Sequence, residues 1–221
     1  MKNETRDRLV QTARMLFWEH GYTGTGIAQI LKAADAGSGS LYYFFPTKED
    51  LLNAVLELYK ERLWPEVVQP VFDRVSDPIE RIFGILEGYR RLLEGTDYLR
   101  GCPIGNLALE LAGSHPAARQ LLAENFTGWL GAVEGCLADA SGRLPDSVDR
   151  KQLALFVLTT MEGAVMLART YRSTAPYDAA VTQLRDYFDR LLRDGTEWST
   201  PRPVPATRKS TRTKPKSSSR P

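Results

Sequence analysis

The chain has 221 residues, of which 43% are hydrophobic, and a formal net charge of +2 at pH 7. This content suits one large globular domain or two small ones, each with a packed core. A secreted, disulfide-stapled protein is excluded, because two cysteines, Cys102 and Cys136, are too few for a disulfide framework in a chain of this size. A leader peptide and a run of about eighteen apolar residues are both missing, so we expect a cytoplasmic protein with no membrane partner.

Charge is distributed unevenly along the chain. Seven basic and no acidic residues follow Glu197, and residues 198–221 are also rich in Pro, Ser and Thr, so they are predicted to form a disordered basic tail. Such a tail can lie along the phosphates of DNA or can simply solubilise the chain, and both alternatives remain open. Residues 1–50 contain six basic and six acidic residues, which leaves the N-terminal part without a net positive charge.

Apolar residues recur at helical spacing and no alternating strand pattern occurs, which predicts an all-α fold. The first helix is expected over about residues 5–20 and should stop at Gly21, a favourable C-cap residue. Thr25 is expected to cap a second helix of about ten residues. Residues 35–37, Asp-Ala-Gly, should break that helix, because Asp and Gly both tolerate left-handed backbone.

A third short helix is expected over about residues 38–44, with an exposed face that is small, hydroxylated and aromatic. Pro46 should end this helix. Thr47 and Asp50 then have the spacing of a capping box, which predicts the start of the next helix.

Two short helices joined by a three-residue turn describe a helix-turn-helix, whose second helix enters the major groove of DNA. Residues 21–51 contain the stretches G-Y-T-G-T-G-I-A-Q-I-L-K-A-A and G-S-L-Y-Y-F-F-P-T-K-E-D-L. These stretches resemble the DNA-binding signature of the TetR family of bacterial transcriptional regulators. The resemblance implies a three-helix DNA-binding domain at the N-terminus.

The turn departs from the family pattern. Asp35, Ala36 and Gly37 stand where the family commonly has Gly-Val-Ser, and Ser38 opens the recognition helix where a basic or polar residue is usual. That helix offers no Arg, Asn or Gln for bidentate base contacts. Phosphates are expected to be bound by helix N-termini and hydroxyl groups. The predicted DNA contacts are Thr25, Ser38, Gly39, Ser40, Tyr42, Tyr43 and Lys48.

The remainder of the chain is predicted to form a larger helical domain. A fourth helix should run from Thr47 to about Leu63 and end at Pro65, and a fifth should start at Asp77 and Pro78. The helices expected after that, with Cys102 at the cap of the first, cover about residues 101–112, 117–140, 153–167 and 177–193. The segment 153–167 is apolar nearly all round and should be buried on more than one side.

These patterns predict a DNA-binding domain over residues 1–46, a ligand-binding and dimerisation domain over residues 47–197, and the tail over residues 198–221. In the family that the chain resembles, the last two helices of each subunit pair in a four-helix dimer interface. The segment 153–167 suits this role, with one face for its own core and one for a partner, although a central helix of a monomer is the alternative. The resemblance thus implies a homodimeric repressor that binds a palindromic double-stranded DNA operator and is released by a small, largely apolar inducer.

The ligand pocket of such a domain is expected to be mostly apolar with a few polar groups. The candidates are Tyr89, Cys102, Asn106, Glu110, Phe126, Trp129, Glu162 and Met166. Cys102 also carries a sharper hypothesis, because a helix N-terminus and the neighbouring Arg100 favour a thiolate. The segment G-C-P-I-G-N-L-A-L-E-L resembles that of a TetR branch in which some members sense electrophiles or oxidants through such a cysteine. A buried structural thiol is the alternative.

An all-helical enzyme with a Cys102 centre is the alternative of another class. Against it, His20 falls in the predicted DNA-binding part and His115 has no evident partner, so no pair of nucleophile and base is recognisable. Metal-ligand spacing and a phosphate-binding glycine loop are also missing. We therefore expect no enzymatic activity, no cofactor and no metal.

Overall fold

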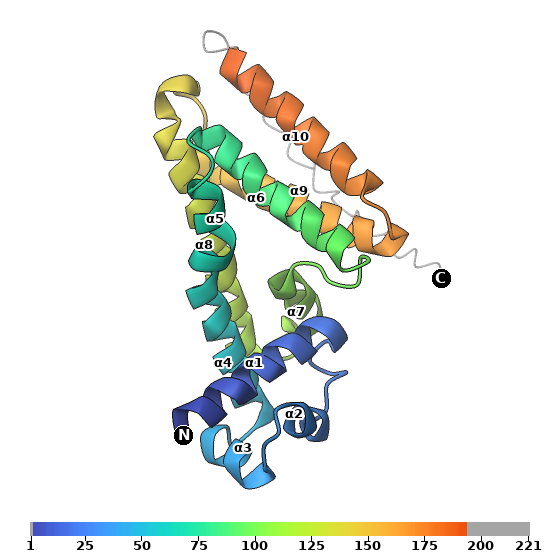
Figure 1. Ribbon diagram of the computed structural model, residues 1–221. Coiled ribbons are helices and arrows are strands. Elements are labelled where there is room, and N and C mark those ends of the chain that lie inside the picture. Colours follow the sequence, from blue (N-terminus) through green and yellow to red (C-terminus); the bar gives the residue numbers. More distant parts are fainter. Residues whose placement is uncertain (1, 194–221) are drawn as a thin grey trace, which may run out of the picture.

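The structure, a computed structural model, describes residues 2–193, which fold into helices and connecting turns without any strand (Figure 1). The predicted all-α fold class is confirmed. Met1 and residues 194–221, which include the predicted basic tail, lie outside the described residues. The N-terminal helices form one end of an elongated molecule, and the last two helices form the other (Figure 1).

The N-terminal end consists of α1 (Lys2–His20), α2 (Ile27–Ala33) and α3 (Ser38–Phe44). Helix α1 stops before Gly21, which has a φ of +76° and so fulfils the predicted role of a left-handed cap. The buried side chains that join the three helices are Leu9, Val10, Ala13, Phe17, Ile30, Ala34 and Leu41. Arg8 braces the end of α2, because its Nε donates to the backbone oxygen of Ala34 at 2.6 Å.

The prediction that Thr25 caps α2 was wrong. Gly26 is the N-cap of α2 and makes no side-chain capping bond. The Thr25 side chain is completely buried, and its hydroxyl donates to the backbone oxygens of Gly21 at 2.7 Å and Leu16 at 3.2 Å. The hydroxyl of Thr25 thus points back to the end of α1, and α2 begins without a side-chain cap.

The turn and the recognition helix follow the prediction closely. Asp35 takes the left-handed conformation with a φ of 45°. Helix α3 spans the predicted residues, with Leu41 and Phe45 buried beneath it. Thr47 forms the predicted capping box, because its hydroxyl accepts the N–H of Asp50 at 3.1 Å while the Asp50 carboxylate accepts the N–H of Thr47 at 2.9 Å.

Pro65 does not end the fourth helix, which corrects that prediction. Helix α4 (Lys48–Arg62) runs into a π-helical segment, η1 (Leu63–Val68), and then into α5 (Gln69–Phe72). The N–H of Gln69 donates to the oxygen of Trp64, five residues earlier. The wider turn accommodates Pro65, which lacks an N–H, without stopping the helical path.

The second part of the chain contains α6 (Pro78–Gly95), α7 (Pro103–Leu111), α8 (Pro116–Asp139), the short 3-10 turn η2 (Ser141–Arg143), α9 (Arg150–Tyr171) and α10 (Ala175–Arg193). Asp77 and Cys102 cap α6 and α7 as predicted. Helix α8 packs along α4 and also contacts α9, so it connects the two ends of the molecule (Figure 1).

Helix α9 is buried on one side only within this single chain. By length and composition alone it could cross a membrane, but it packs against α8 and α10 as a core helix does. This chain buries one side of the helix, and burial of a second side by a partner stays a prediction. Its other side carries large apolar residues that are 42% to 69% exposed, namely Leu155, Phe156, Met166, Leu167 and Tyr171.

Candidate nucleic-acid interface and ligand cavity

Helix α3 presents a continuous exposed face at the N-terminal end of the molecule. Tyr42 is 51% exposed and Tyr43 is 67% exposed, beside the exposed residues Ser38, Gly39 and Ser40. Their main contribution to a complex is hydroxyl groups, which can bind phosphate or base edges, and two aromatic rings. Five of the seven predicted DNA contacts therefore share one surface.

The other two predicted contacts, Thr25 and Lys48, do not belong to that surface. The hydroxyl of Thr25 is buried and donates to backbone oxygens at the end of α1. The Lys48 ammonium donates to the backbone oxygen of Tyr22 at 2.5 Å and lies 4.1 Å from the centre of the Tyr22 ring. Burial lowers the pKa of Lys48, although the nearby Glu110 opposes this shift. Lys48 therefore holds the turn between α1 and α2.

Glu110 takes part in the same contact and lines no part of the cavity described below. Its carboxylate accepts the backbone N–H of Tyr22 at 2.9 Å and that of Thr23 at 2.6 Å. Burial by itself would raise the pKa of Glu110, but these hydrogen bonds and Lys48 outweigh it, so the pKa lies below its ordinary value. The predicted ligand residue Glu110 is thus a link between α7 and the N-terminal helices.

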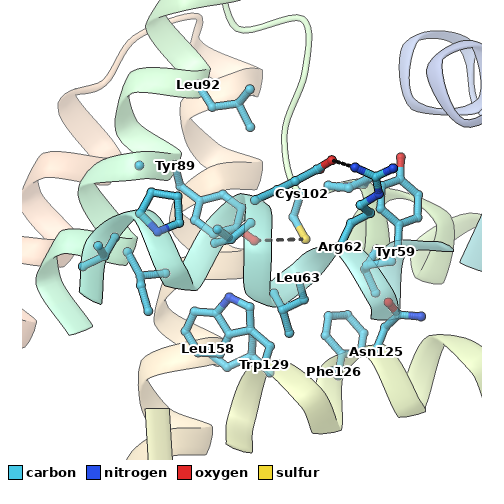
Figure 2. Close-up of a pocket in the computed structure, with 18 of the residues that line it drawn as sticks. Tyr59, Arg62, Leu63, Tyr89, Leu92, Cys102, Asn125, Phe126, Trp129 and Leu158 are labelled. Carbon is cyan, nitrogen blue, oxygen red and sulfur yellow. Dashed lines mark hydrogen bonds and ion pairs between the residues drawn. The ribbon is translucent and has the colours of Figure 1, made fainter. Parts of the chain in front are cut away.

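A cavity of about 370 Å³ lies between α1, the α4–α6 region, α7, α8 and α9 (Figure 2). This volume falls within the range of small-molecule sites. The structure brings five of the eight predicted ligand residues into its wall, namely Tyr89, Cys102, Phe126, Trp129 and Glu162.

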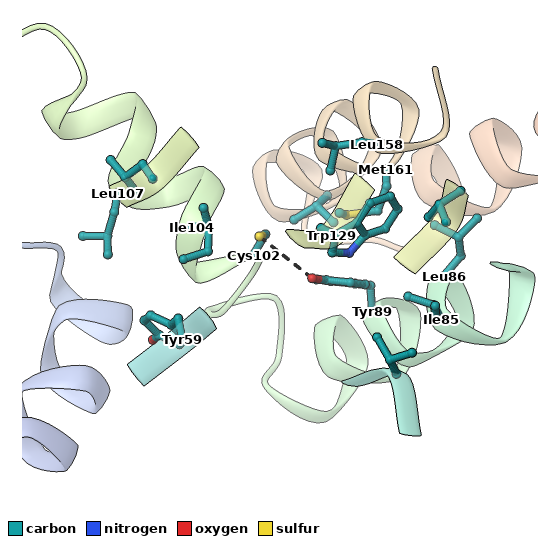
Figure 3. Close-up of a cluster of buried hydrophobic side chains, with 14 of the residues drawn as sticks. Tyr59, Ile85, Leu86, Tyr89, Cys102, Ile104, Leu107, Trp129, Leu158 and Met161 are labelled. Atoms are coloured by element: carbon teal, nitrogen blue, oxygen red, sulfur yellow. Dashed lines mark hydrogen bonds between the residues drawn. The ribbon is translucent and has the colours of Figure 1, made fainter. Parts of the chain in front are cut away.

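The thiol of Cys102 is enclosed in this wall. The Tyr89 hydroxyl lies 4.0 Å from Cys102 Sγ, which also accepts the backbone N–H of Gly105 at 3.5 Å (Figure 3). Burial and the neighbouring Glu162 raise the pKa of Cys102 far above its ordinary value. The expectation of a stabilised thiolate is therefore wrong, because the loss of water around the thiol outweighs the helix N-terminus.

Asn106 and Met166 line a separate, outward-facing groove between α7, α8 and α9. Asn106 Oδ1 accepts a hydrogen bond from Arg169 at 2.5 Å, and Met166 is half exposed. The groove and the cavity share Phe126, Leu158 and Glu162. Within residues 2–193, no group of three or more His, Cys, Asp or Glu residues is placed to hold a metal ion.

Two residues that line the cavity come from α1 and were not predicted. Arg14 and Trp18 reach the cavity from the N-terminal helix. Trp18 Nε1 also donates to the backbone oxygen of Gly101 at 2.7 Å, directly before Cys102. A signal was present in the sequence, since Trp18 lies just outside the apolar stripe of α1 and is too large and apolar for a solvated surface.

Comparison with known proteins agrees with this arrangement. Residues 9–55 match the family described as bacterial regulatory proteins, tetR family, and residues 78–184 match the tetracyclin repressor-like C-terminal domain. The chain is 30% identical to the HTH-type transcriptional regulator LmrA of Bacillus subtilis (strain 168), over 78% of this chain and 90% of that protein.

Two further relatives cover nearly the whole fold. The HTH-type transcriptional repressor DhaR of Mycobacterium sp. (strain GP1) is 26% identical over 86% of this chain and 94% of its own length. The crystal structure of a TetR transcriptional regulator from Chloroflexus aurantiacus J-10-FL is 29% identical with a TM-score of 0.74, covering 86% of this chain and 97% of that one. With its helix-turn-helix and its helical second domain, the chain belongs to the TetR family of bacterial transcriptional regulators.

Proposed function

We propose that the protein is a homodimeric, cytoplasmic repressor that binds a palindromic operator and is released when a small molecule enters the cavity. In this proposal the DNA-binding domain covers residues 1–46, and the ligand-binding and dimerisation domain covers residues 47–197. The main support is the position of the cavity, whose wall includes Arg14 and Trp18 of α1. A ligand in this cavity touches the helix that braces the recognition helix.

Helix α7 offers the route from the ligand to the DNA-binding face. Its first residues, Pro103 and Ile104, line the cavity, while Glu110 near its other end holds the backbone of Tyr22 and Thr23. A displacement of the first turn of α7 therefore pulls on the turn between α1 and α2. Shifting a two-state equilibrium from 99:1 to 1:99 takes about 5.5 kcal/mol of differential binding, which a buried apolar ligand can supply.

The exposed apolar face of α9 supports the homodimer. Leu155, Phe156 and Leu167 are each more than two-fifths exposed, although they lie on a helix whose opposite side is fully packed. Large apolar residues gathered on one helix face favour pairing with a second copy by two-fold symmetry. Dimerisation is required for function, because two recognition helices can then bind half-sites about 34 Å apart.

Repression, as opposed to activation, is supported by the family and by the relative named as a repressor, DhaR. A repressor needs only to occupy its operator and to leave it on binding a ligand. The cavity and the contact of α7 with the turn after α1 are sufficient for release from the operator. A surface that recruits RNA polymerase is not needed for repression.

The experiment that tests this function is selection of bound fragments from sheared genomic DNA of the source organism. We expect enrichment of a palindrome whose half-sites are about one helical turn apart. Protection of both half-sites in a footprint, together with one dimer per site in sedimentation, would establish that the protein binds the operator as a dimer. Failure to enrich any sequence at low and at moderate salt would contradict operator binding.

A further inference from the structure

The indole N–H of Trp129 is buried in the cavity wall without a hydrogen-bond acceptor among the described residues. Trp129 is 5% exposed, and its nitrogen faces Tyr89 (Figure 2). An indole N–H can only donate, and a buried donor that stays unpaired is costly to the folded state. The cavity therefore lacks an acceptor at this position.

Tyr89 supplies a second donor to the same part of the cavity (Figure 3). Among residues 2–193 its hydroxyl has one hydrogen-bond partner, Cys102 Sγ at 4.0 Å, and a thiol sulfur is a weak acceptor. Burial raises the pKa of Tyr89 well above its ordinary value, so the hydroxyl keeps its proton. Tyr89 comes from α6 and Trp129 from α8, so two separate helices direct donors toward one place.

The charged side chains of the cavity wall do not favour a charged ligand. Four arginines line the cavity. Arg62, Arg74 and Arg91 are exposed to solvent, and the guanidinium of the half-buried Arg14 binds the carboxylate of Glu66 at 2.6 Å. Glu162 Oε1 is buried without a hydrogen-bond partner in the part of the chain that the structure describes, and burial raises the pKa of Glu162, which favours its neutral form. Glu162 packs against Gly105, where any Cβ would overlap the carboxyl group. The inner wall thus offers neutral polar groups within an apolar enclosure.

We propose that the ligand is an uncharged, largely apolar molecule with a carbonyl oxygen that accepts hydrogen bonds from Trp129 Nε1 and Tyr89 Oη. The two lone pairs of one carbonyl oxygen match these two donors. The apolar body of the ligand would pack against Ile85, Leu92, Ile104, Phe126 and Leu158. This inference rests on the proposed function, because it takes the cavity to be the inducer site.

A cationic ligand and a carboxylate ligand would each need a different charged group in the cavity wall. An organic cation would need an ionised Glu162, which burial disfavours. A carboxylate would need a free cation deep in the cavity, but Arg14 is paired with Glu66, and the other three arginines of the lining, Arg62, Arg74 and Arg91, are exposed to solvent. A primary ammonium has no acceptor for the indole N–H of Trp129. A carboxylate could accept this N–H, but its charge would be desolvated among neutral donors.

The test is calorimetric titration of the full-length protein with four naphthalenes that differ only in one substituent. The substituents are acetyl, ethyl, carboxylate and aminomethyl. We expect 2-acetylnaphthalene to bind tightest. Trp129→Phe and Tyr89→Phe should each weaken its binding about tenfold while changing that of 2-ethylnaphthalene less than about twofold.

Trp64→Phe is the matched control, because Trp64 is 49% exposed outside the cavity and its Nε1 already donates to Gln69. It should leave the affinity ratio of the ketone to the ethyl compound unchanged. Circular dichroism melting of each variant establishes that it is folded, and Tyr89→Phe, which keeps its ring, serves if Trp129→Phe does not fold.

Three results would overturn the assignment: tightest binding of the aminomethyl compound, tightest binding of the carboxylate, or no binding of the ketone at millimolar concentration. An unchanged ratio in both cavity variants would also overturn it. Because the titration contains no DNA, such a failure leaves the operator result standing. Conversely, ketone binding without any operator would support the site while contradicting the repressor.

Discussion

The Glu110 carboxylate accepts the backbone N–H of Tyr22 at 2.9 Å, which joins residues 88 positions apart in the sequence. The backbone oxygen of the same Tyr22 accepts from the Lys48 ammonium at 2.5 Å. The turn after α1 is therefore held on both sides, by α7 through Glu110 and by the first turn of α4 through Lys48. In the proposed mechanism, this clamp is a contact through which the ligand domain repositions the DNA-binding helices.

Glu110→Gln is expected to destabilise the protein by about 1–2 kcal/mol in urea unfolding. The amide oxygen can accept one backbone N–H, but the amide nitrogen then faces the other donor. The same variant should respond less to inducer, because α7 holds the turn less firmly. Glu61→Gln, an exposed carboxylate on α4, is the control and should change stability by less than about 0.5 kcal/mol. Equal stability of the two variants would argue against the clamp.

The contribution of Glu110 also has a defined dependence on pH. Its pKa is lowered in the folded protein, so its stabilisation is complete above the unfolded pKa of about 4.3 and is lost as the pH falls through the folded pKa. The stability difference between the native protein and Glu110→Gln should therefore be constant near neutral pH and shrink below about pH 4. A difference that persists unchanged at pH 3 would contradict the role of the carboxylate.

Gly21→Ala is expected to cost about 1–2 kcal/mol of stability, because a left-handed φ of +76° is strained for alanine. The new Cβ would also lie 2.9 Å from Glu110 Oε2, so it would press on the clamp. Gly113→Ala is the matched control, since nothing lies within 4 Å of a Cβ there. Thermal unfolding measures the stability of both variants. Equal melting temperatures would mean that the turn after α1 adapts to alanine without strain.

Local patterns predicted most of the helices. The sequence predicted three local features correctly: the left-handed Asp35, the capping box of Thr47 and the cap at Asp77. Each depends on residues no more than four positions away. Pro65 misled for the same reason, since a proline is a helix breaker by local rules, whereas here a π turn absorbs it.

The candidate cavity was only partly predictable. Tyr89 was found as a polar group on an apolar helix and Trp129 as a large aromatic residue, and both line one cavity. Glu110 has the same appearance in the sequence, but its partners lie 88 positions earlier in a turn that no periodicity connects with α7. Arg14 was missed because a charged residue on α1 is indistinguishable from a solvated one until α4 and η1 are placed beside it.

Tyr42→Phe is expected to weaken operator binding about tenfold, since a hydrogen bond to a charged phosphate is worth about 1.5 kcal/mol. Tyr42 is half exposed on α3, so the melting temperature should not change. Fluorescence anisotropy with the selected operator measures the affinity. Tyr171→Phe, which removes the hydroxyl of an exposed tyrosine on α9, should leave it unaltered. Full affinity in Tyr42→Phe would exclude the hydroxyl from DNA contact.

Leu155→Glu is expected to raise the dimer dissociation constant about tenfold or more, because it places a charge in the apolar face of α9. Leu155 is 53% exposed in the single chain, so the fold of each subunit should persist. Met15→Glu alters an exposed apolar residue on α1, at the opposite end of the molecule, and should not affect dimerisation. Sedimentation velocity distinguishes the two, and an unshifted dimer in Leu155→Glu would place the interface elsewhere.

Both cysteines are expected to react slowly with Ellman's reagent in the native protein at pH 8. Burial raises the pKa of Cys102 strongly and that of Cys136 to about 11, so thiolate is scarce and enclosed at this pH. Both thiols should react within seconds in urea. Rapid native reaction of one thiol, abolished by Cys102→Ser, would instead revive a sensor at this position. Such a sensor would require α7 to open first, because the same packing that forms the cavity wall keeps Cys102 only 5% exposed.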